Sequence, residues 1–227
     1  MTNWSESLVV FDLETTGVRV EFDRVVTAHV GRIDASGAVL EHTDWLVNPG
    51  VPIPEGAAAV HGITTERAVA EGRDPATSIA EIVDSLTRFR DTGVPLVAYN
   101  AAYDLTLLHH EARRYGIAPF EPGVVIDPLI IDKAVDRYRK GKRTLTVACE
   151  VYGVALGSAH EASADAIAAG RVAQALARQY PNLLELSPAD LHSQQQVWQR
   201  EQAESFAEWK RRNGEPGFIA EVGWPVR

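Results

Sequence analysis

A mixed α/β fold made of packed layers is predicted for this chain of 227 residues, because strand patterns come first and helices alternating with short strands follow. Runs of β-branched and apolar residues at 7–13, 24–34 and 38–47 predict three strands. Residues 34–37, with the sequence Asp-Ala-Ser-Gly, form a turn signal between the second run and the third. We therefore expect a three-stranded antiparallel meander at the start of the sheet.

The rest of the predicted domain repeats a unit in which a short strand precedes a helix. Residues 48–75 are expected to be a loop rich in Pro, Gly and Ala, and the apolar spacing in 76–89 predicts a helix that packs on the sheet. The further expected elements are strands 95–99 and 124–126 and helices 102–115, 128–138, 144–152 and 162–180. Crossover helices would make the later strands parallel, so the sheet is expected to be mixed.

The length and the apolar content of 45% suit one catalytic domain, predicted at 1–181, with an added helical segment at 182–227. Residues 188–212 are expected to form a long polar helix. Trp198, Phe206 and Trp209 fall on one face of it, and packing against their own domain is the favoured interpretation. Self-association as a homodimer and partner binding are the alternatives.

Composition limits the class of protein. The formal net charge of −9 argues against a protein that coats nucleic acid, although a nuclease stays compatible because catalytic carboxylates add negative charge. The single Cys149 excludes an internal disulfide. Since the sequence shows neither a signal peptide nor a stretch approaching roughly 18 apolar residues, we expect a cytoplasmic protein that does not enter a membrane.

Four acidic residues are candidates for a shared metal site. Asp12 and Glu14 are two apart at the end of a strand and project from one face, although an acid near a turn is usually a solvated residue or a cap. Asp104 lies in the first turn of helix 102–115, where compensation of the helix dipole is the competing explanation. Asp165 points along the core-facing side of its helix, where an unpaired charge is costly and a metal would satisfy it.

His160 is the candidate proton acceptor. It precedes Asp165 by five positions, which on one helix would separate the two side chains by about 140°, so we expect His160 in the loop before the helix. An imidazole beside metal-binding acids can accept a proton from attacking water, whereas an isolated histidine is usually a solvated surface residue.

Three motifs that contain these residues resemble those of the DEDDh exonucleases, the group that includes the proofreading epsilon subunit of DNA polymerase III, RNase T and oligoribonuclease. VFDLETTG at 10–17, NAAYD at 100–104 and HEASAD at 160–165 occur in the order of the family. The resemblance covers about residues 7–180, and no signature position departs from the pattern. Three motifs in order, on elements that suit them, are far more specific than any one alone.

The resemblance implies a ribonuclease H-like fold and two divalent cations, Mg²⁺ or Mn²⁺, held by Asp12, Glu14, Asp104 and Asp165. His160 would act as general base. The implied activity is 3′–5′ removal of nucleoside 5′-monophosphates from single-stranded nucleic acid, with DNA favoured. The alternatives are an exoribonuclease acting on short or structured RNA and a non-catalytic module associated with DNA polymerase III subunits.

Other positions are expected to contact the substrate through this resemblance. They are Leu13, Thr15 and Thr16 in the first motif, His61 and Ile63 in VHGIT at 60–64, and Asn100 and Tyr103 in the second motif. An ordinary loop residue is the alternative for His61, and bracing of the second motif is the alternative for Asn100. Asp127 is assigned to capping of helix 128–138.

A basic run at 137–143 places five cations in seven residues. In an acidic protein this contrast suggests contacts with strand phosphates by Arg139, Lys140, Lys142 and Arg143, with a solvated loop as the alternative.

Overall fold

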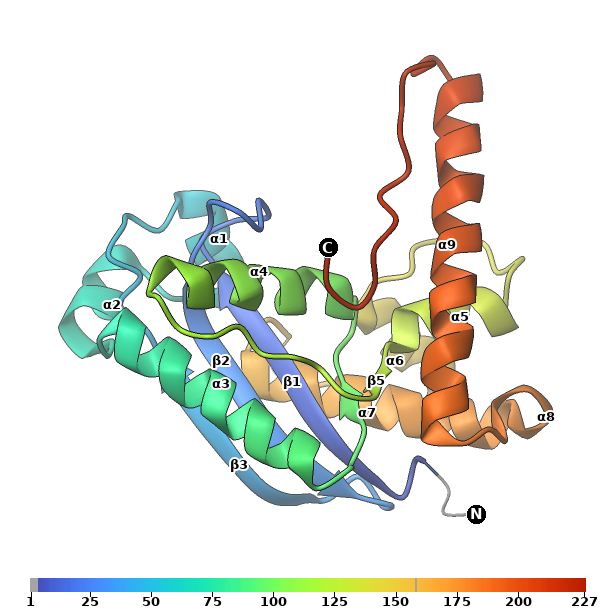
Figure 1. Ribbon diagram of the computed structural model, residues 1–227, viewed down its shortest axis with the longest axis horizontal. Coiled ribbons are helices and arrows are strands. Elements are labelled where there is room, and N and C mark those ends of the chain that lie inside the picture. The colour runs from blue at the N-terminus through green and yellow to red at the C-terminus, as the bar shows by residue number, and fades with distance from the viewer. Residues whose placement is uncertain (1–3, 158) are drawn as a thin grey trace.

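The computed structural model describes residues 4–157 and 159–227. Its centre is a five-stranded sheet with the strand order β3-β2-β1-β4-β5 (Figure 1). The strands are β1 (Ser7–Thr15), β2 (Val25–Asp34), β3 (Val39–Leu46), β4 (Leu96–Val97) and β5 (Val125–Ile126). β1, β2 and β3 pair antiparallel, whereas β4 pairs parallel with β1 and β5 parallel with β4. The predicted α/β class and the mixed five-stranded sheet with its meander are confirmed.

Helices cover both faces of the sheet, as Figure 1 shows. The side chains of β1 alternate between the two layers, because successive residues of a strand point to opposite faces. Val9 and Phe11 belong to the core that α3 (Pro75–Asp91) and α4 (Ala101–Arg114) cover. Leu8 and Val10 belong to the core beneath α7 (Ala162–Gln179). The other main helices are α5 (Pro128–Val135), α6 (Leu145–Tyr152) and α9 (Pro188–Arg212).

Part of the expected loop 48–75 is helical, so this expectation was wrong there. α1 (Glu55–His61) and α2 (Thr65–Glu71) have seven residues each. α1 ends at Gly62 in a left-handed conformation, and the side chain of Thr64 caps the start of α2 by accepting a hydrogen bond from the backbone. Helices of two turns present too few residues for an apolar period to be detected. A further short helix, α8 (Pro181–Leu184), begins where the extension was predicted to start.

Three element boundaries also differ from expectation. β4 and β5 have two residues each, shorter than the predicted strands 95–99 and 124–126. α5 ends at Val135 instead of 138. The basic run 137–143 therefore lies entirely in the connection between α5 and α6.

The C-terminal helix α9 packs on the rest of the domain mainly through its first half, although Gln202 in its second half donates a hydrogen bond to the carbonyl of Ile130 in α5. Leu191 and Gln195 are fully buried, and Trp198 packs against both core clusters. Phe206 and Trp209, by contrast, are 50% and 56% exposed, because the second half of α9 stands away from the sheet (Figure 1). Trp198 thus packs against its own domain as expected, whereas Phe206 and Trp209 stay half-exposed and stack on each other.

The chain then returns from the tip of α9 toward α4, as Figure 1 shows. Trp224 is buried in the core, and the backbone N–H of Arg227 donates a hydrogen bond of 3.0 Å to Oγ1 of Thr106. Within the described ranges, no helix, α9 included, is long and apolar enough to cross a membrane.

Gly170 sets how closely α7 approaches the sheet. A Cβ at this position would lie 2.6 Å from side-chain atoms of both Val10 and Ile33. Because Asp165 belongs to the same helix, this close approach also fixes the height of its carboxylate above β1.

Substitution of this glycine should loosen the packing of α7. We expect Gly170→Val to lower the free energy of unfolding by about 1–3 kcal/mol, since extra atoms in a packed core force neighbouring side chains apart. Urea denaturation measures the change. Ala177→Val, near the end of the same helix, is the matched control and should change it by less than about 1 kcal/mol. Equal, small losses in both variants would contradict this account of Gly170.

Candidate active site

The first acidic pair lies at the end of β1. Asp12 and Glu14 pair with His29 and Thr27 of β2, and both side chains project toward the α7 face, like Leu8 and Val10. Both are half-buried. Asp12 and Glu14 therefore share one face at the edge where α4 begins, as the sequence predicted.

The second motif brings Asp104 against this pair. Its side chain is only 3% exposed, and its Oδ1 accepts a hydrogen bond of 3.2 Å from the backbone N–H of Leu13. Since Leu13 lies between Asp12 and Glu14 in the chain, this bond ties the start of α4 directly to the first motif.

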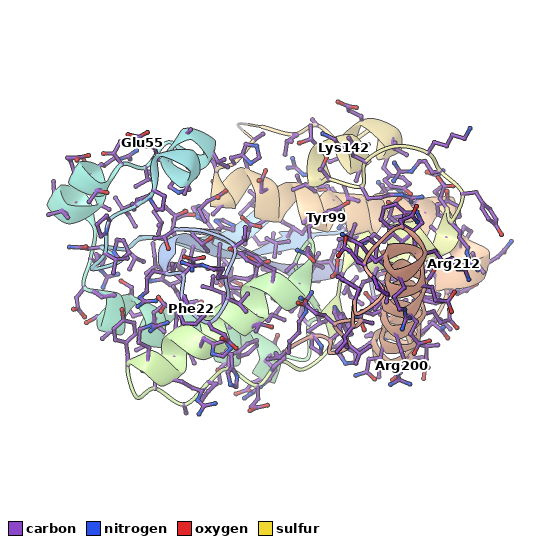
Figure 2. The ribbon with its side chains drawn as sticks, turned by 90° about the horizontal axis from the view of Figure 1, so that it is seen from above. Phe22, Glu55, Tyr99, Lys142, Arg200 and Arg212 are labelled. Atoms are coloured by element: carbon purple, nitrogen blue, oxygen red, sulfur yellow. The ribbon has the colours of Figure 1, made fainter. Side chains whose placement is uncertain are left out.

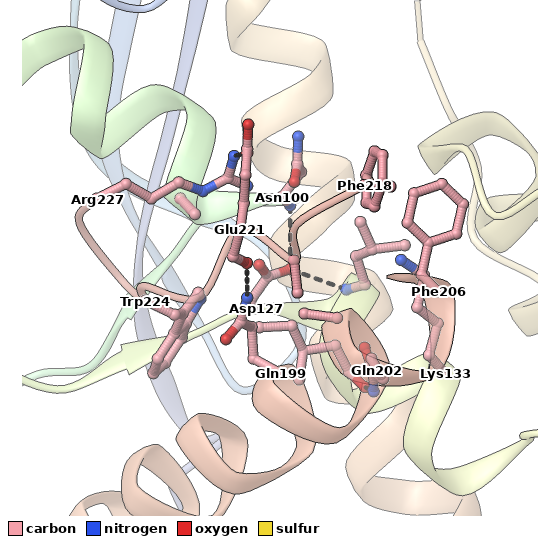
Figure 3. Close-up of a pocket in the computed structure, with 15 residues that line it drawn as sticks. Asn100, Asp127, Lys133, Gln199, Gln202, Phe206, Phe218, Glu221, Trp224 and Arg227 are labelled. Carbon is pink, nitrogen blue, oxygen red and sulfur yellow. Dashed lines mark hydrogen bonds and ion pairs between the residues drawn. The ribbon is translucent and has the colours of Figure 1, made fainter. Parts of the chain in front are cut away.

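The start of α4 is held by a residue that sequence reasoning assigned only to a cap. Asp127 does cap α5 by accepting from the N–H of Leu129 at 3.0 Å. Its carboxylate also accepts from the backbone N–H of Asn100 at 3.0 Å and of Ala101 at 2.9 Å (Figure 3). Asn100 has a left-handed φ of 65°, which these bonds stabilise. Burial raises the pKa of Asp127 to about 6, although its backbone donors oppose the shift.

Asp127 and Asn100 also line a cavity of about 250 Å³ between α5, α9 and the returning tail (Figure 3). Gln195 of α9 bonds to the segment that contains Asp127, because its Oε1 accepts from the N–H of Asp127 at 2.7 Å and its Nε2 donates to the carbonyl of Val125 at 3.0 Å. The extension is thus joined to the element that positions the second motif. Sequence periodicity gave no signal for these polar contacts, since they link segments distant in the chain.

The third motif places His160 in a loop, as predicted, and Asp165 in the first turn of α7. His160 has a left-handed φ of 68°, and its backbone N–H donates to Oδ2 of Asp165 at 3.2 Å. The imidazole itself is exposed. Glu14, His160 and Asp165 each offer one ligand atom, and these three atoms lie within 4.8 Å of one another. The structure therefore brings the predicted histidine to the predicted acids.

Burial and mutual repulsion shape the electrostatics of the four acids. Burial raises the pKa of Asp12 well above its usual range, and the charges of Asp104, Glu14 and Asp165 add to the shift. Burial also raises the pKa of Asp104 strongly and that of Asp165. For Glu14, burial and the charge of Asp165 raise the pKa to about 7. The four groups resist simultaneous ionisation, because each charge is removed from water and lies near others of its sign.

These residues fit a divalent cation. Oδ1 of Asp165 is buried and has no hydrogen-bond partner in the part of the chain that the structure describes. Carboxylate oxygens are the ligands that Mg²⁺ and Mn²⁺ favour, and a cation would compensate both the repulsion and the unpaired oxygen. Asp12, Glu14, Asp104 and Asp165 are therefore the candidate ligands.

Most of the residues predicted to contact substrate are buried, and Leu13, Thr15 and Thr16 adjoin Asp12 and Glu14 in the chain. Oγ1 of Thr15 and the hydroxyl of Tyr103 lie 2.5 Å apart, and the Tyr103 hydroxyl donates to the carbonyl of Gly17 at 2.6 Å. His61 and Ile63 are both 8% exposed, and the N–H of Ile63 donates to Nδ1 of His61 at 3.2 Å. The remaining members of the set are Leu13 and Thr16, both buried, and Asn100, which lines the cavity described above.

The basic run divides into two kinds of residue. Arg139 and Arg143 are only 13% exposed, and both form salt bridges with the carboxylate of Asp132, which is fully buried. Lys140 and Lys142 are exposed. Figure 2, in which Lys142 is labelled, shows this loop on the outside of the molecule. Two of the four residues predicted to contact phosphates, Arg139 and Arg143, thus already neutralise the buried carboxylate of Asp132.

Residues 9–173 match the family model of the RNase T type, which is described as exonuclease. The matched residues make up well over half of the chain. The chain belongs to the exonuclease family. The DEDDh-type 3′–5′ exonuclease resemblance inferred from the three motifs is thereby confirmed.

Two relatives of this exonuclease carry names that refer to DNA polymerase III. The chain is 39% identical over 131 residues to a DNA polymerase III subunit epsilon-like protein of Rhodobacter capsulatus, a match that covers 57% of this chain and 18% of the relative. It is 29% identical over 175 residues to the PolC-type DNA polymerase III of Lacticaseibacillus paracasei, covering 77% of this chain and 12% of the relative. The chain therefore spans less than a fifth of either relative.

Among solved structures, this exonuclease is similar to Escherichia coli exonuclease I in complex with a dT13 oligonucleotide. The TM-score is 0.67 at 22% identity, and the match covers 79% of this chain and 43% of the other. The likeness shows that the two share a fold, of the ribonuclease H-like type.

Proposed function

We propose that this chain removes nucleotides one at a time from the 3′ end of single-stranded nucleic acid, with DNA preferred, in a reaction that depends on Mg²⁺ or Mn²⁺. The observation that carries the proposal is the convergence of Asp104 and Asp165 on the β1 pair, with His160 at the solvent side. Four repelling acids with an exposed imidazole beside them suit the hydrolysis of a phosphodiester.

The chain's own groups have distinct tasks in this reaction. Two divalent cations bound by the four carboxylates would supply an activated water and stabilise charge on the leaving 3′ oxygen. His160 accepts the proton of that water at its imidazole, which stands exposed in a loop whose backbone is bonded to Asp165. Asp127 keeps the first turn of α4, and with it Asp104, in position.

The preference for DNA is supported by the relatives, which include a DNA polymerase III subunit epsilon-like protein and exonuclease I bound to dT13. We propose that Leu13, Thr15 and Tyr103 contact the terminal nucleotide, together with Thr16, His61, Ile63 and Asn100. The bond between Thr15 and Tyr103 joins the first and second motifs. The proposed setting is the cytoplasm, with free DNA 3′ ends or DNA polymerase III subunits as partners.

The decisive assay follows release from single-stranded DNA and RNA labelled at either end, with Mg²⁺, Mn²⁺ or EDTA. We expect stepwise shortening from the 3′ end of DNA that EDTA abolishes. His160→Ala should lower kcat by about 10²–10⁴-fold, because a general base is lost. Asp165→Asn should abolish the activity, because a cation ligand is lost.

His110→Ala and Asp91→Asn, at other positions on α4 and α3, are the matched controls and should retain activity. Faster loss from RNA than from DNA would redirect the proposal to an exoribonuclease. No degradation of any substrate by a folded, cation-binding wild type would contradict it.

We also propose that the exposed Lys140 and Lys142 contact strand phosphates, whereas Arg139 and Arg143 serve Asp132. Lys140→Gln combined with Lys142→Gln should raise KM several-fold and leave kcat unchanged. The slope of log KM against log salt should fall by about 0.7 for each lysine–phosphate interaction that the substitutions remove.

Arg200→Gln is the control for loss of an exposed cation, since Arg200 and Lys142 lie on opposite sides of the view in Figure 2. An unchanged KM and salt slope in the double lysine variant would contradict the proposed phosphate contacts and indicate that the loop contacts only solvent.

A further inference from the structure

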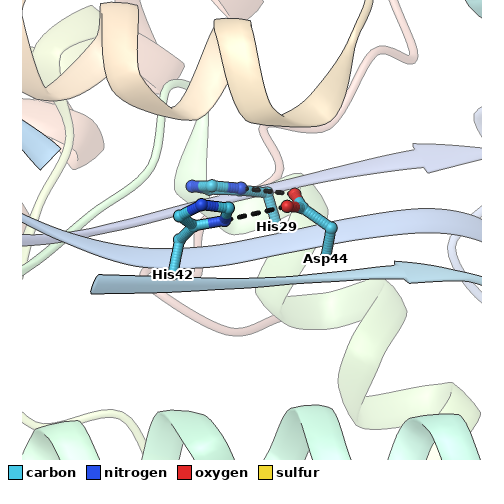
Figure 4. Close-up of side chains that lie close together, drawn as sticks. All are labelled: His29, His42 and Asp44. Carbon is cyan, nitrogen blue, oxygen red and sulfur yellow. Dashed lines mark hydrogen bonds and ion pairs between the residues drawn. The ribbon is translucent and has the colours of Figure 1, made fainter.

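Two clusters of side chains outside the active site differ in whether their polar groups are already paired. In the first, Nδ1 of His29 lies 2.6 Å from Oδ1 of Asp44, and Nδ1 of His42 lies 2.9 Å from Oδ2 (Figure 4). The Asp44 carboxylate therefore accepts from both rings, and the cluster joins the edge strand β3 to β2. The second cluster lines a groove between α5 and α9, where aromatic rings and cations face solvent.

This groove has a volume of about 730 Å³ and two walls of different chemistry. One wall is aromatic, because Trp198, Phe206 and Trp209 recur at helical spacing along α9. The other wall is basic. Lys133 belongs to α5, and Arg137 belongs to the basic run that follows this helix.

The aromatic wall is a fixed and half-exposed surface. The rings of Phe206 and Trp209 are inclined by 18°, with centroids 6.0 Å apart. Phe218 of the returning tail meets Phe206 edge-on at 5.6 Å, and Nζ of Lys210 lies 5.8 Å from the centroid of Phe206. These contacts hold the rings in place while both residues stay about half-exposed. Exposed aromatic rings of this kind are the surfaces on which unpaired bases stack.

The charges of the groove favour an anionic ligand. Lys133 and Arg137 face one acid, Glu201, among the described residues that line it, although the formal net charge of the chain is −9. Neither cation forms a salt bridge within 4–157 and 159–227, whereas the neighbouring Arg139 and Arg143 are paired with a buried acid. Burial lowers the pKa of Lys133, so a phosphate bound nearby would stabilise its charged form.

The groove is connected to the residues that start α4. Lys133, Gln202 and Phe206 line both the groove and the cavity of about 250 Å³ that Figure 3 shows. That cavity reaches Asn100, which precedes α4 and lies four positions before Asp104. The C-terminal extension therefore provides a surface that continues outward from the second motif.

We propose that this groove binds the single-stranded part of the substrate that lies 5′ of the cleaved nucleotide. Its bases stack on Phe206 and Trp209, and its phosphates lie beside Lys133 and Arg137. A single strand matches both walls at once, because each nucleotide carries a flat base and a negative charge. The inference rests on the proposed exonuclease function and adds to it a binding subsite in the C-terminal extension.

The test measures binding of a fluorescein-labelled dT strand of about 20 nucleotides to the full chain, by fluorescence anisotropy in EDTA, where cation-dependent cleavage does not occur. We expect Trp209→Ala to raise the Kd about five-fold or more, because a stacking surface is lost. Trp209→Tyr keeps an aromatic ring and should stay within about two-fold of wild type, whereas Trp209→Leu should behave like Trp209→Ala. Arg137→Gln should raise the Kd and reduce the slope of log Kd against log salt by about 0.7.

Val197→Ala and Arg200→Gln are the matched controls, because they remove an exposed apolar side chain and an exposed cation of α9 that do not line the groove. Both should bind as wild type does. Circular dichroism establishes that the variants fold, which the exposure of Trp209 favours. A Kd unchanged in Trp209→Ala and Arg137→Gln would overturn the proposal. So would equal binding by Trp209→Leu and Trp209→Tyr. An unchanged Kd together with loss of a dimer in sedimentation would assign the groove to self-association instead.

The length of the substrate separates this subsite from the exonuclease centre. Trp209→Ala should raise KM for the long strand and leave cleavage of a dinucleotide unchanged, since a dinucleotide does not extend beyond the active site. Equal loss of activity on both lengths would overturn the proposal. Absence of cleavage by wild type would contradict the exonuclease function, whereas the binding comparison in EDTA would still decide whether the groove holds a strand.

Discussion

Mutual repulsion among four carboxylates at one end of the sheet is the constraint on which the rest of this structure depends. Asp12, Glu14 and Asp165 are partly buried and Asp104 almost completely, so each has lost much of the water that would stabilise its charge. Burial, and after it the charge of Asp165, raises the pKa of Glu14 to about 7. A protein without bound cations tolerates such an arrangement only if the surrounding fold is rigid enough to prevent the acids from moving apart.

Three features supply that rigidity. The backbone of Leu13 binds Asp104, so the first and second motifs cannot separate without losing a hydrogen bond. Asp127 holds the two residues that start α4, and Gln195 of α9 in turn bonds the backbone of Asp127. On the α7 face of the sheet, Gly170 lets α7 lie close to β1. The C-terminal helix thus contributes to the geometry of the site although it supplies none of the predicted metal ligands.

Much of this could be predicted from the sequence, because local rules decide where side chains point. Strand alternation places Asp12 and Glu14 on one face, and helical angles put His160 in a loop. The second role of Asp127 could not be predicted, since it joins the end of β5 to the start of α4, 26 positions away in the chain at Ala101.

Periodicity likewise groups Phe206 and Trp209 on one face of α9 but does not say whether another element covers that face. The basic run 137–143 also looked uniform in sequence. Only the buried position of Asp132 separates the two arginines from the two lysines.

The most direct test of the central claim is thermal unfolding of wild type and Glu14→Gln across pH, in EDTA and in Mn²⁺. The pKa of Glu14 is raised on folding from 4.5 to about 7, so the folded state binds its proton more tightly than the unfolded state does. This contribution to the stability of the folded state is complete below pH 4.5 and disappears as pH rises through 7. In EDTA, wild type and Glu14→Gln should have the same Tm near pH 4.5, and Glu14→Gln should have the higher Tm above pH 7. In Mn²⁺ above pH 7 the order of the two Tm values should reverse, because the variant lacks one ligand of the ion. Wild type at least as stable as Glu14→Gln in EDTA above pH 7, or equal stabilisation of both by Mn²⁺, would contradict the account.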